Sequence, residues 1–530
     1  MTTSNPATNE PTVSDPDPEK GVGPEPVIQS PGHASDSSSI DPGADLLAGE
    51  NKNIALVRKM HLLNNAIDQI GWTNFHWKLF CLSGFGYAVD SMVTLLQSVI
   101  AAQAYLEIAP NGGYATGLSI ASYAGLLVGA LFWGVTADII GRRIAFNSTL
   151  FIAAAATIVA GAAPSWESLG FFVALIGFGG GGNLVLDPTV FLEYVPSSRQ
   201  WSITTMACWW GVGQAFTGFI AWGFLPQSRW NCSQPEKCTW NNNMGWRLVF
   251  FTAGAIVFVM SMSRVLVVRL KETPKYLLGQ GRDADVVNNI QALAKRYNRP
   301  CDLTLEQLKS HGDIVLSETT KRHAPRVLMH HLKGLFATRR LALSTLMVWF
   351  SWTLIGLAYP LFYVFLPSII SNRIPVEESS YITWRNYTLT NVSGIIGPII
   401  AGFLSSINRI GRKYTMVVGA LLTMIFFFGY TAITTTTQNV AFSCVLACCI
   451  NIYYGTLYAY TAEIFPSAHR ATGSGIAVAL NRVMGMISAV IAAEGGTDTP
   501  VPLYVCASLF LVIALVSAAF PFEPQGRRSS

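Results

Sequence analysis

The sequence predicts an all-α membrane protein in which twelve transmembrane helices form two pseudo-symmetric six-helix bundles. Of its 530 residues, 51% are hydrophobic and 12% are charged, about half of the roughly 25% charged residues of a typical soluble protein. Apolar windows of about 20 residues, long enough for a helix to cross the hydrocarbon layer, recur after residue 76. We expect spans at residues 77–101, 114–137, 144–163, 168–193, 201–225, 246–268, 341–367, 389–407, 414–435, 440–462, 473–493 and 501–520.

An internal repeat indicates that the two bundles are related. The turn "GVTADIIGRR" (134–143) after the second span is echoed by "GFLSSINRIGRK" (402–413) after the eighth. In the same way, "LEYVPSSR" (192–199) after the fourth span is echoed by "AEIFPSAHR" (462–470) after the tenth. Transporters built from two similar bundles hold their substrate between them, near the middle of the membrane. The repeat therefore favours a transporter.

The spans divide six and six around a long polar insert. This insert, residues 269–340, contains 14 Lys and Arg against 7 Asp and Glu, and stretches such as "DADVVNNIQALAKRYN" are compatible with short surface helices. The first 50 residues are rich in Pro, Ser, Gly and Asp and cannot bury enough apolar surface to fold. The expected domains are a disordered cytoplasmic tail and pre-helix segment (1–70), an N-terminal bundle (71–268), a cytoplasmic linker (269–340), a C-terminal bundle (341–520) and a cytoplasmic tail (521–530).

Basic residues alternate between the two sides of the predicted membrane. Lys and Arg in short loops mark the cytoplasmic side, and with both termini inside, Arg142, Arg143, Arg412 and the insert fall on that side together. No cleaved signal peptide is indicated, so we expect the first helix to act as the targeting signal. We expect a multi-pass protein of the plasma membrane.

The loop "WNCSQPEKCTW" then lies outside the cell. A disulfide between Cys232 and Cys238 could persist there, because that side is oxidising. Two sequons also fall in outside loops, at Asn231 and Asn386, and are candidates for glycosylation.

Charged residues and glycines recur in the turns on the predicted cytoplasmic side. In "DIIGRR", Asp138 can pair with a guanidinium or cap a neighbouring helix, which indicates a latch. Positive-inside charge alone explains the arginines but not the acid and the glycines. We interpret Glu193 with Arg199, and Glu463 with Arg470, as ion pairs that help to hold this side closed. The gating candidates are Gly134, Asp138, Gly141, Arg142, Arg143, Glu193, Arg199, Glu272, Arg412, Glu463 and Arg470.

Two acids lie inside predicted spans, where an ionised Asp costs roughly 2.5 to 3.5 kcal/mol. Asp90 lies about 20 Å along the first span, and Asp187 about 9 Å before the end of the fourth, at 1.5 Å per residue. Each could carry a proton or bind substrate, or be a structural acid tied to polar neighbours. Asn183 shares a helical face with Asp187, and Pro188 loosens the turn. We therefore expect Asp187 to face a polar cavity. We expect Asp187→Asn to leave the protein folded and at the membrane, yet to abolish or strongly reduce substrate movement and its pH dependence.

Aromatic and polar residues in other spans complete the candidate proton and substrate site. Several share a helical face at four-residue spacing and could line a cavity, although aromatic residues also serve as packing or interface anchors. Arg482 could offset a substrate carboxylate or pair with an internal acid. The full set of candidates is Asp90, Asn183, Asp187, Trp210, Gln214, Tyr359, Tyr363, Asn451, Tyr454, Tyr458 and Arg482.

Nothing in the sequence favours an enzyme or an ATP-driven pump. The segment "GFGGGG" (177–182) matches a dinucleotide fingerprint only formally, since an apolar helix surrounds it, and we expect its glycines to allow close helix packing. No phosphate loop, metal cluster or nucleophile with a base is found. We therefore expect no cofactor, no metal and no nucleic-acid partner. The expected partners are a small-molecule substrate, protons and the lipid bilayer, and the protein is expected to be a monomer.

Several motifs resemble the sugar-porter side of the major facilitator superfamily, over about residues 70 to 525: the repeated turns, the "E..P..R" ends of spans four and ten, and "KETPKYLL" (271–278). The segments "IGWTNFHWKLFCLSGFGYAVDSM", "GFGGGGNLVLDPTVFLEYVPSSR", "YAYTAEIFPSAHRATGSG" and "PFEPQGRR" are similar to its synaptic-vesicle-related and nicotinate-permease-like branch, which has fungal members. The resemblance implies the major facilitator fold. Asn408 and Ser406 stand where the family turn more usually has an acid, and residues 173–175 are apolar where sugar porters tend to have an arginine, which argues against a hexose.

We therefore expect a secondary active transporter that moves a small organic solute, such as an organic acid, a sugar-like molecule or a related metabolite, by alternating access coupled to protons. Two alternatives stay open. One is export of a secondary metabolite or toxin on the same fold, and the other is a transport-silent sensor or scaffold that signals through its tail and linker.

Overall fold

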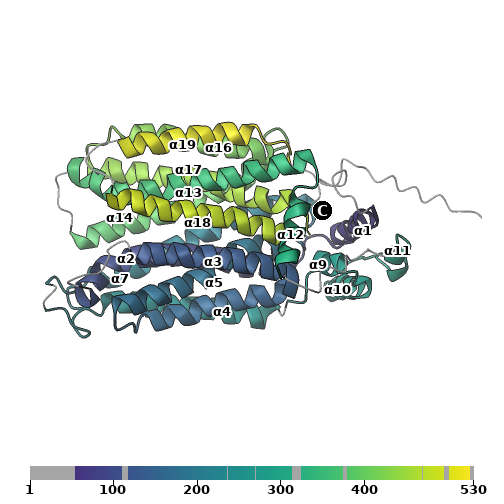
Figure 1. Ribbon diagram of the computed structural model, residues 1–530, viewed down its shortest axis with the longest axis horizontal. Coiled ribbons are helices and arrows are strands. Elements are labelled where there is room, and N and C mark those ends of the chain that lie inside the picture. Colours follow the sequence, from purple (N-terminus) through teal and green to yellow (C-terminus); the bar gives the residue numbers. More distant parts are fainter. Residues whose placement is uncertain are drawn as a thin grey trace, which may run out of the picture. The chain divides into compact units, whose positions relative to one another are not determined.

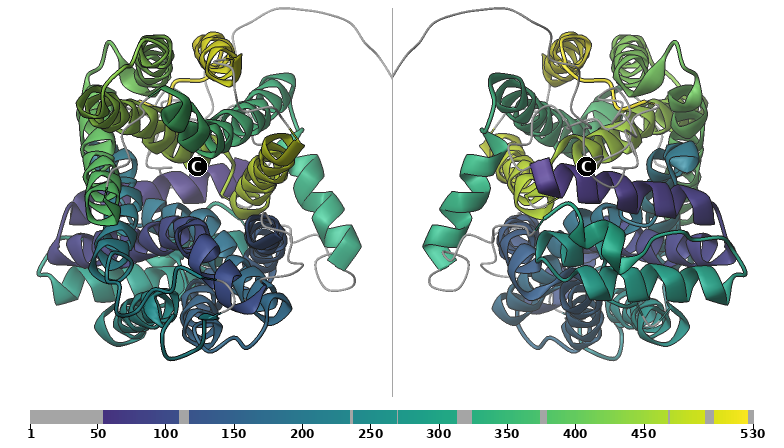
Figure 2. Two further views of the ribbon diagram at one scale, coloured as in Figure 1. Left: turned by 90° about the vertical axis from the view of Figure 1, so that its left-hand side faces the viewer. Right: turned by 90° about the vertical axis from the view of Figure 1, so that its right-hand side faces the viewer.

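Each of the twelve expected spans corresponds to helix in the computed structural model, which describes residues 54–109, 117–234, 237–268, 270–312, 324–373, 379–467, 469–494 and 501–525. The N-terminal helices, which we call the N-bundle, are α2 (Asn74–Ile108), α3 (Gly117–Ile140), α4 (Arg142–Ala160), α5 (Trp166–Leu192), α6 (Trp201–Met206), α7 (Cys208–Phe224) and α8 (Gly245–Ser263) with the π-helical turn η3 (Arg264–Val268). The C-bundle consists of α13 (Arg339–Arg373), α14 (Ser380–Ser393), α15 (Ile396–Ser406), α16 (Gly411–Tyr430), α17 (Thr436–Ile464), α18 (Arg470–Glu494) and α19 (Val501–Ala518). Figures 1 and 2 show the two bundles side by side.

Eleven helices of the described residues are long and apolar enough to cross a membrane. The remaining expected span, 201–225, is interrupted at Ala207, so that α6 has 6 residues and α7 has 17. The eighth span is similarly divided into α14 and α15 at Gly394 and Ile395. The number and order of the spans agree with the prediction, and the boundaries differ by a few residues.

The fourth and tenth spans begin at matching polar caps. Ser165 accepts a hydrogen bond from the backbone N–H of Ser168 at the start of α5, at 3.3 Å. Thr435 accepts one from Gln438 at the start of α17, also at 3.3 Å. A side-chain cap satisfies a backbone donor that the first helical turn leaves unpaired. The repeat therefore extends to the ends of the two helices that carry the "E..P..R" motifs.

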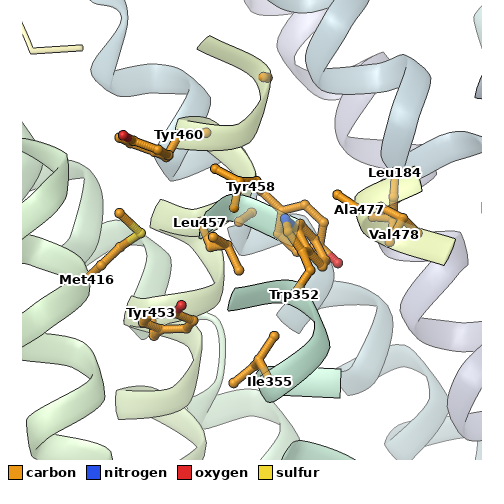
Figure 3. Packing of buried hydrophobic residues seen from close by; sticks show 14 of the residues in the cluster. Leu184, Trp352, Ile355, Met416, Tyr453, Leu457, Tyr458, Tyr460, Ala477 and Val478 are labelled. Atoms are coloured by element: carbon orange, nitrogen blue, oxygen red, sulfur yellow. The ribbon is translucent and has the colours of Figure 1, made fainter. Parts of the chain in front are cut away.

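Glycines bring α5 directly against α3, as the segment "GFGGGG" predicts. A Cβ at Gly181 would lie 2.3 Å from the Leu126 carbonyl oxygen, and one at Gly125 would lie 2.0 Å from that of Ala174. Across the two bundles, Leu184 of α5 lies beside Ala477 and Val478 of α18 (Figure 3). In lipid no hydrophobic effect drives helices together, so close backbone packing of this kind stabilises their association instead.

A separate hydrophobic core lies at the end of the bundles that carries the linker helices, which we call the linker side. Its helices are α1 (Ile54–Ile70), α9 (Pro274–Gly279), α10 (Asp283–Arg296) and α11 (Leu305–Lys309). The core includes Met60, Leu63, Ile67, Leu277 and Ile290, and Nζ of Lys59 lies 2.5 Å from the buried Asp283 carboxylate.

The helix α1 lies in the expected pre-helix segment, beyond the first 50 residues, for which disorder is predicted. Its apolar side chains recur at helical spacing at Met60, Leu63, Ile67 and Ile70. This stripe becomes a stable helix because α9 and α10 cover it. These covering helices lie more than 200 residues away in sequence, as the pair of Lys59 with Asp283 of α10 shows. Residues 1–53 and 526–530, parts of the two expected tails, lie outside the described residues.

The last linker helix, α12 (Ala324–Leu335), packs at the start of α18. The Nδ1 atoms of His331 and His469 lie 2.8 Å apart, and a Cβ at Gly334 would overlap the His469 ring. The linker therefore contacts both bundles, through Glu272 and α9 on the N-bundle and through α12 on the C-bundle.

Glycine packing between α3 and α5 yields a stability prediction. Gly181→Ala should lower the free energy of unfolding by about 1–3 kcal/mol, because the new methyl group overpacks the interface. Gly170→Ala, in the same helix with nothing within 4 Å of the new Cβ, should be neutral or stabilising by up to about 1 kcal/mol, since alanine favours a helix. Thermal unfolding of the two purified variants in one detergent checks this; equal midpoints would contradict it.

Candidate functional site

A cavity of about 320 Å³ lies between the two bundles. Side chains of α2, α3 and α7 line it from the N-bundle, and side chains of α13, α14, α17 and α18 from the C-bundle. Its aromatic lining consists of Tyr123, Trp210, Tyr359, Tyr387, Tyr454 and Tyr458. The volume is at the lower end of the range for small-molecule sites, roughly 300–1,000 Å³. The cavity therefore suits a small ligand.

One ion pair between the two bundles lies at the wall of this cavity. Nη2 of Arg482 in α18 donates to both carboxylate oxygens of Asp90 in α2, at 3.2 and 3.0 Å. Both side chains are almost completely buried, and Arg482 is the one charged side chain among the described residues that line the cavity. The Arg482 Nε is buried and has no hydrogen-bond partner among the described residues. Asp90 thus uses only part of the guanidinium's donor capacity.

An aromatic stack forms one wall of the cavity. Trp210 of α7 lies parallel to Tyr454 of α17, with ring centroids 6.4 Å apart, and Tyr454 is stacked on Tyr458 at 5.9 Å. Trp352 packs edge-on behind Tyr458 at 4.7 Å (Figure 3). Stacked and edge-on rings at these distances attract one another. The wall spans both bundles and presents ring faces and hydroxyl groups together.

A second polar bridge connects the bundles at the same cavity. Nε2 of Gln214 donates to the Tyr359 hydroxyl at 3.1 Å. Both residues, with Trp210, Tyr454, Tyr458 and Arg482, are candidates from the sequence that the structure brings together around one space. Asp90 joins them through Arg482. Their role as substrate contacts stays a prediction.

Other candidates from the sequence lie elsewhere. Asn451 donates to the Ala447 carbonyl of its own helix at 2.8 Å and packs against Gly394 and Gly397, where α14 and α15 meet. The side chain of Tyr363 lies outside the described side chains. Tyr123, Tyr387 and Asn481 line the cavity but have no sequence signal that separates them from other polar residues of apolar helices.

The environment of Asp187 differs from the expected polar cavity. Its carboxylate accepts two hydrogen bonds from Nη2 of Arg264, at 2.8 and 2.9 Å, and both side chains are fully buried inside the N-bundle. Arg264 also donates to the backbone carbonyls of Leu82 at 2.9 Å and Phe146 at 2.8 Å, while Asn183 Oδ1 lies 3.5 Å from its Nη1. The structure therefore places Asp187 in a buried ion pair with Arg264.

Arg264 is a residue that the sequence analysis missed. It lies near the end of the expected span 246–268, where a basic residue is explained by the positive-inside rule alone. The structure instead turns it inward from η3 toward α2, α4 and α5.

On the linker side, the N-bundle is organised around Arg142. Its guanidinium forms an ion pair with Glu193 at the end of α5. Its Nη2 also donates to the Ser467 carbonyl of the C-bundle at 2.7 Å. The Glu272 carboxylate accepts from the backbone N–H of Arg142 at 2.9 Å and caps α4. The turn requires Gly141, because its φ is 99° and Glu272 lies where a Cβ would be.

Asp138 connects the bundles at the same level. Its Oδ2 accepts from the backbone N–H and the hydroxyl of Thr472, both at 3.0 Å, in the first turn of α18. Its other oxygen lies 3.8 Å from Nη2 of Arg142. Gly134 allows the approach of the two helices, because a Cβ there would lie 2.9 Å from the Ala471 carbonyl oxygen.

The C-bundle repeats this arrangement around Arg412. Its guanidinium pairs with Glu463, with Nη2 to Oε1 at 2.5 Å, and Nη2 also donates to the Gln200 carbonyl of the N-bundle at 3.0 Å. Glu523 accepts from the backbone N–H of Arg412 at 2.9 Å, as Glu272 does for Arg142. Gly411 has a φ of 59°. Glu523, in the motif "PFEPQGRR", had no role assigned from the sequence.

Two details of the predicted network change. Glu193 is fully buried against Arg142, while Arg199 is exposed, so the predicted pair of these two is not formed. Arg470 donates from Nε to the Phe465 carbonyl at 3.2 Å, and the ion pair of Glu463 is with Arg412. In both halves, the arginine that follows the glycine turn forms the ion pair with the acid.

Arg143 is exposed, and its backbone N–H lies 3.4 Å from Glu272. Tyr276 of α9 donates to the Ile139 carbonyl at 3.1 Å beside this turn. Burial and the nearby Glu272 carboxylate raise the pKa of the Tyr276 phenol, so it remains a neutral donor.

On the opposite side, Cys232 and Cys238 are joined in a disulfide with Cα atoms 5.6 Å apart. Nδ2 of Asn231 donates to the carbonyls of Phe224 and Gln227, both at 2.8 Å. Attachment of a glycan at Nδ2 would replace one of its two hydrogens and so remove one of these bonds, and glycosylation of Asn231 stays a prediction. Asn386 lies within α14 rather than in a loop.

Comparisons with known proteins agree with this architecture. A family model of the Major Facilitator Superfamily matches residues 79–489. The "MFS siderochrome iron transporter 1" of Ceriporiopsis subvermispora is 38% identical over 484 residues, which cover 89% of this chain and 92% of that protein. The "Niacin transporter NiaP" of Acinetobacter baylyi is 25% identical over 434 residues, covering 81% and 89%. These matches confirm the resemblance to the superfamily and to its nicotinate-permease-like branch with fungal members.

A solved structure of the proton:xylose symporter XylE, bound to 6-bromo-6-deoxy-D-glucose, superposes with a TM-score of 0.65 at 16% sequence identity and covers 86% of this chain and 98% of that one. This likeness confirms the expected fold of two six-helix bundles.

The Asp187 ion pair revises the expectation that Asp187→Asn leaves the protein folded. The variant strands the Arg264 charge in a dry interior, which should cost about 3–5 kcal/mol of unfolding free energy. Adding Arg264→Gln removes the stranded charge and keeps a side-chain donor, so the double variant should recover much of the loss. Thermal unfolding of the single and double variants checks this. A single variant as stable as the parent would contradict it.

Proposed function

The chain belongs to the major facilitator superfamily of transporters, and on that premise we propose that it is a secondary active transporter of a small aromatic monocarboxylate, coupled to protons. The observation that carries the proposal is the Arg482–Asp90 pair at the wall of a cavity lined by aromatic rings. The name of a relative supports the substrate class, because niacin combines one ring with one carboxylate.

Arg482 supplies the recognition of a carboxylate. A guanidinium binds a carboxylate through two parallel N–H donors. In this structure Asp90 occupies Nη2 alone, and Nε is buried without a partner in the part of the chain that the structure describes. A substrate carboxylate can take these donors while its ring lies along Trp210 and Tyr454.

Asp90 supplies the coupling to protons. While Asp90 is ionised, it competes with the substrate for Arg482; when it is protonated, the arginine is free to bind the substrate, since a buried charge demands a partner. One proton and one monoanion then cross together, so the step carries no net charge. A pH gradient drives such a cycle at about 1.4 kcal/mol per pH unit, and the membrane potential does not.

Alternating access follows from the contacts between the bundles. The linker-side contacts of Asp138, Arg142 and Arg412 hold that side closed, and their release would open the cavity there. We place the linker and both termini in the cytoplasm because of the Lys and Arg bias, in a monomer of the plasma membrane.

A second candidate is transport of an iron chelate, which the 38% identity to the "MFS siderochrome iron transporter 1" favours. The cavity of about 320 Å³ favours a smaller cargo. Export and a transport-silent role remain outcomes of the test.

Uptake into proteoliposomes tests the proposal. The panel contains nicotinate, its carboxamide, a hexose and a ferric hydroxamate chelate, each with an imposed pH gradient or an imposed potential. Accumulation of nicotinate-like acids with the pH gradient alone supports the proposal. Accumulation of the hexose or the chelate instead, or of none of the panel, would overturn it.

Two variants separate the roles of the cavity pair. Arg482→Gln should weaken binding of the carboxylate by about 10- to 100-fold, since a hydrogen bond to a charged group contributes about 1.5–3 kcal/mol. Binding of the uncharged carboxamide, the matched control, should hardly change. Asp90→Asn should retain carboxylate binding and lose its pH dependence. Titration of the purified proteins between pH 5 and 8 measures both effects, and equal losses for acid and amide would refute the assignment.

A further inference from the structure

The contact of Arg412 with the N-bundle depends on a backbone atom rather than on a side chain. Nη2 of Arg412 donates to the Gln200 carbonyl at 3.0 Å. Gln200 follows the short 3-10 turn η1 (Ser197–Arg199), between α5 and α6. A carbonyl in a loop is a good gate contact only if something fixes the loop.

The helix α1 fixes it. Oδ1 of Asp68 accepts from the backbone N–H of Ser197 at 2.7 Å, and Oδ2 accepts from the Ser197 hydroxyl at 2.9 Å. Asp68, Ser197 and Gln200 line one small cavity of about 10 Å³ together with Asn64 and Lys275, a space of about one water molecule. The Asp68 carboxylate therefore holds the turn that ends in the gate carbonyl.

The helix α1 is itself anchored. Its apolar stripe is buried in the core of the linker-side helices, and Lys59 pairs with Asp283 at 2.5 Å with both side chains buried. Asp68 thus projects from a fixed element, and a continuous chain of contacts runs from Asp68 through η1 and Gln200 to Arg412 of the C-bundle.

We propose that Asp68 is a positioning residue of the linker-side gate: α1 acts as a brace that presents the Gln200 carbonyl to Arg412 and so favours the state closed on the linker side. The consequence for transport rate rests on the proposed function, whereas the consequence for accessibility does not.

The residue next to Asp68 offers a matched control. Gln69 exchanges two hydrogen bonds with Asp302, at 3.0 and 3.1 Å, and these are exposed and have no contact with η1. Gln69→Ala therefore removes a pair of bonds of α1 without touching the proposed chain.

A cysteine at Thr205 reports on the gate. Thr205 of α6 lies between the bundles, where its hydroxyl would lie 2.0 Å from a Cβ at Gly402 of α15. The rate at which a soluble thiol reagent modifies Thr205→Cys, resolved by peptide mass spectrometry on the full chain in nanodiscs, measures how often this interface opens.

Asp68→Asn should raise this rate about fivefold or more, the usual size of a coupling between sites, while Gln69→Ala leaves it unchanged. Ser197→Ala removes only the side-chain bond and should give a smaller rise in the same direction. If Asp68→Asn does not fold, the labelling rate of Ser197→Ala tests the proposal in its place.

Unchanged labelling in folded Asp68→Asn, or an equal rise in Gln69→Ala, would overturn the proposal. Failure of the panel to identify a substrate would leave the labelling result standing, so the two proposals fail separately.

Discussion

Burying a charge in a bilayer is costly unless an opposite charge meets it, and most of this molecule's polar architecture answers that constraint. Each of its two deep acids, Asp90 and Asp187, lies against an arginine from another helix. The difference between the two pairs lies in where the partner comes from. Arg264 belongs to the same bundle as Asp187, so their bond survives any rigid movement of one bundle against the other. Arg482 belongs to the opposite bundle from Asp90, so that bond is the one that a change of state must remake.

The cost of an unpaired buried charge also bears on how the linker side would open in the proposed cycle. Arg142 and Arg412 keep their carboxylates within their own bundles and give only further donors to carbonyls across the interface. Parting the bundles therefore breaks hydrogen bonds, each worth about 1.5–3 kcal/mol to a charged group, and leaves no buried charge alone. Breaking the Arg142–Glu193 or Arg412–Glu463 ion pair would cost more, about 3–5 kcal/mol for each charge left unpaired.

The sequence predicts the spans well because hydropathy and length suffice to define a transmembrane helix, and it finds Asp90 and Arg482 because charges are rare inside such helices. It does not predict that these two meet, since they are 392 residues apart. Nearness along the chain also misleads: Arg199 follows Glu193 closely, yet Arg142 takes that acid. Arg264 was hidden by a general rule for basic residues at span ends, and α1 because its stripe needs partners that folding alone brings near.

The repeat is imperfect at one point, since Asn408 stands where Asp138 would be. Asp138 reaches across the interface to the backbone N–H of Thr472 in the first turn of α18. The repeat aligns Thr472 with Ser202 of α6, and Asn408 is exposed. On the N-bundle a carboxylate comes instead from Asp68, which binds Ser197 in the turn before α6 from the same side of the interface. In the proposed cycle, Asp68 moves with the turn that it holds and would keep Gln200 in position in every state, whereas Asp138 would release Thr472 when the gate opens. In that cycle the Asp138–Thr472 bond is released and the Asp68–Ser197 bond is kept. This difference accounts for a brace on the N-bundle alone.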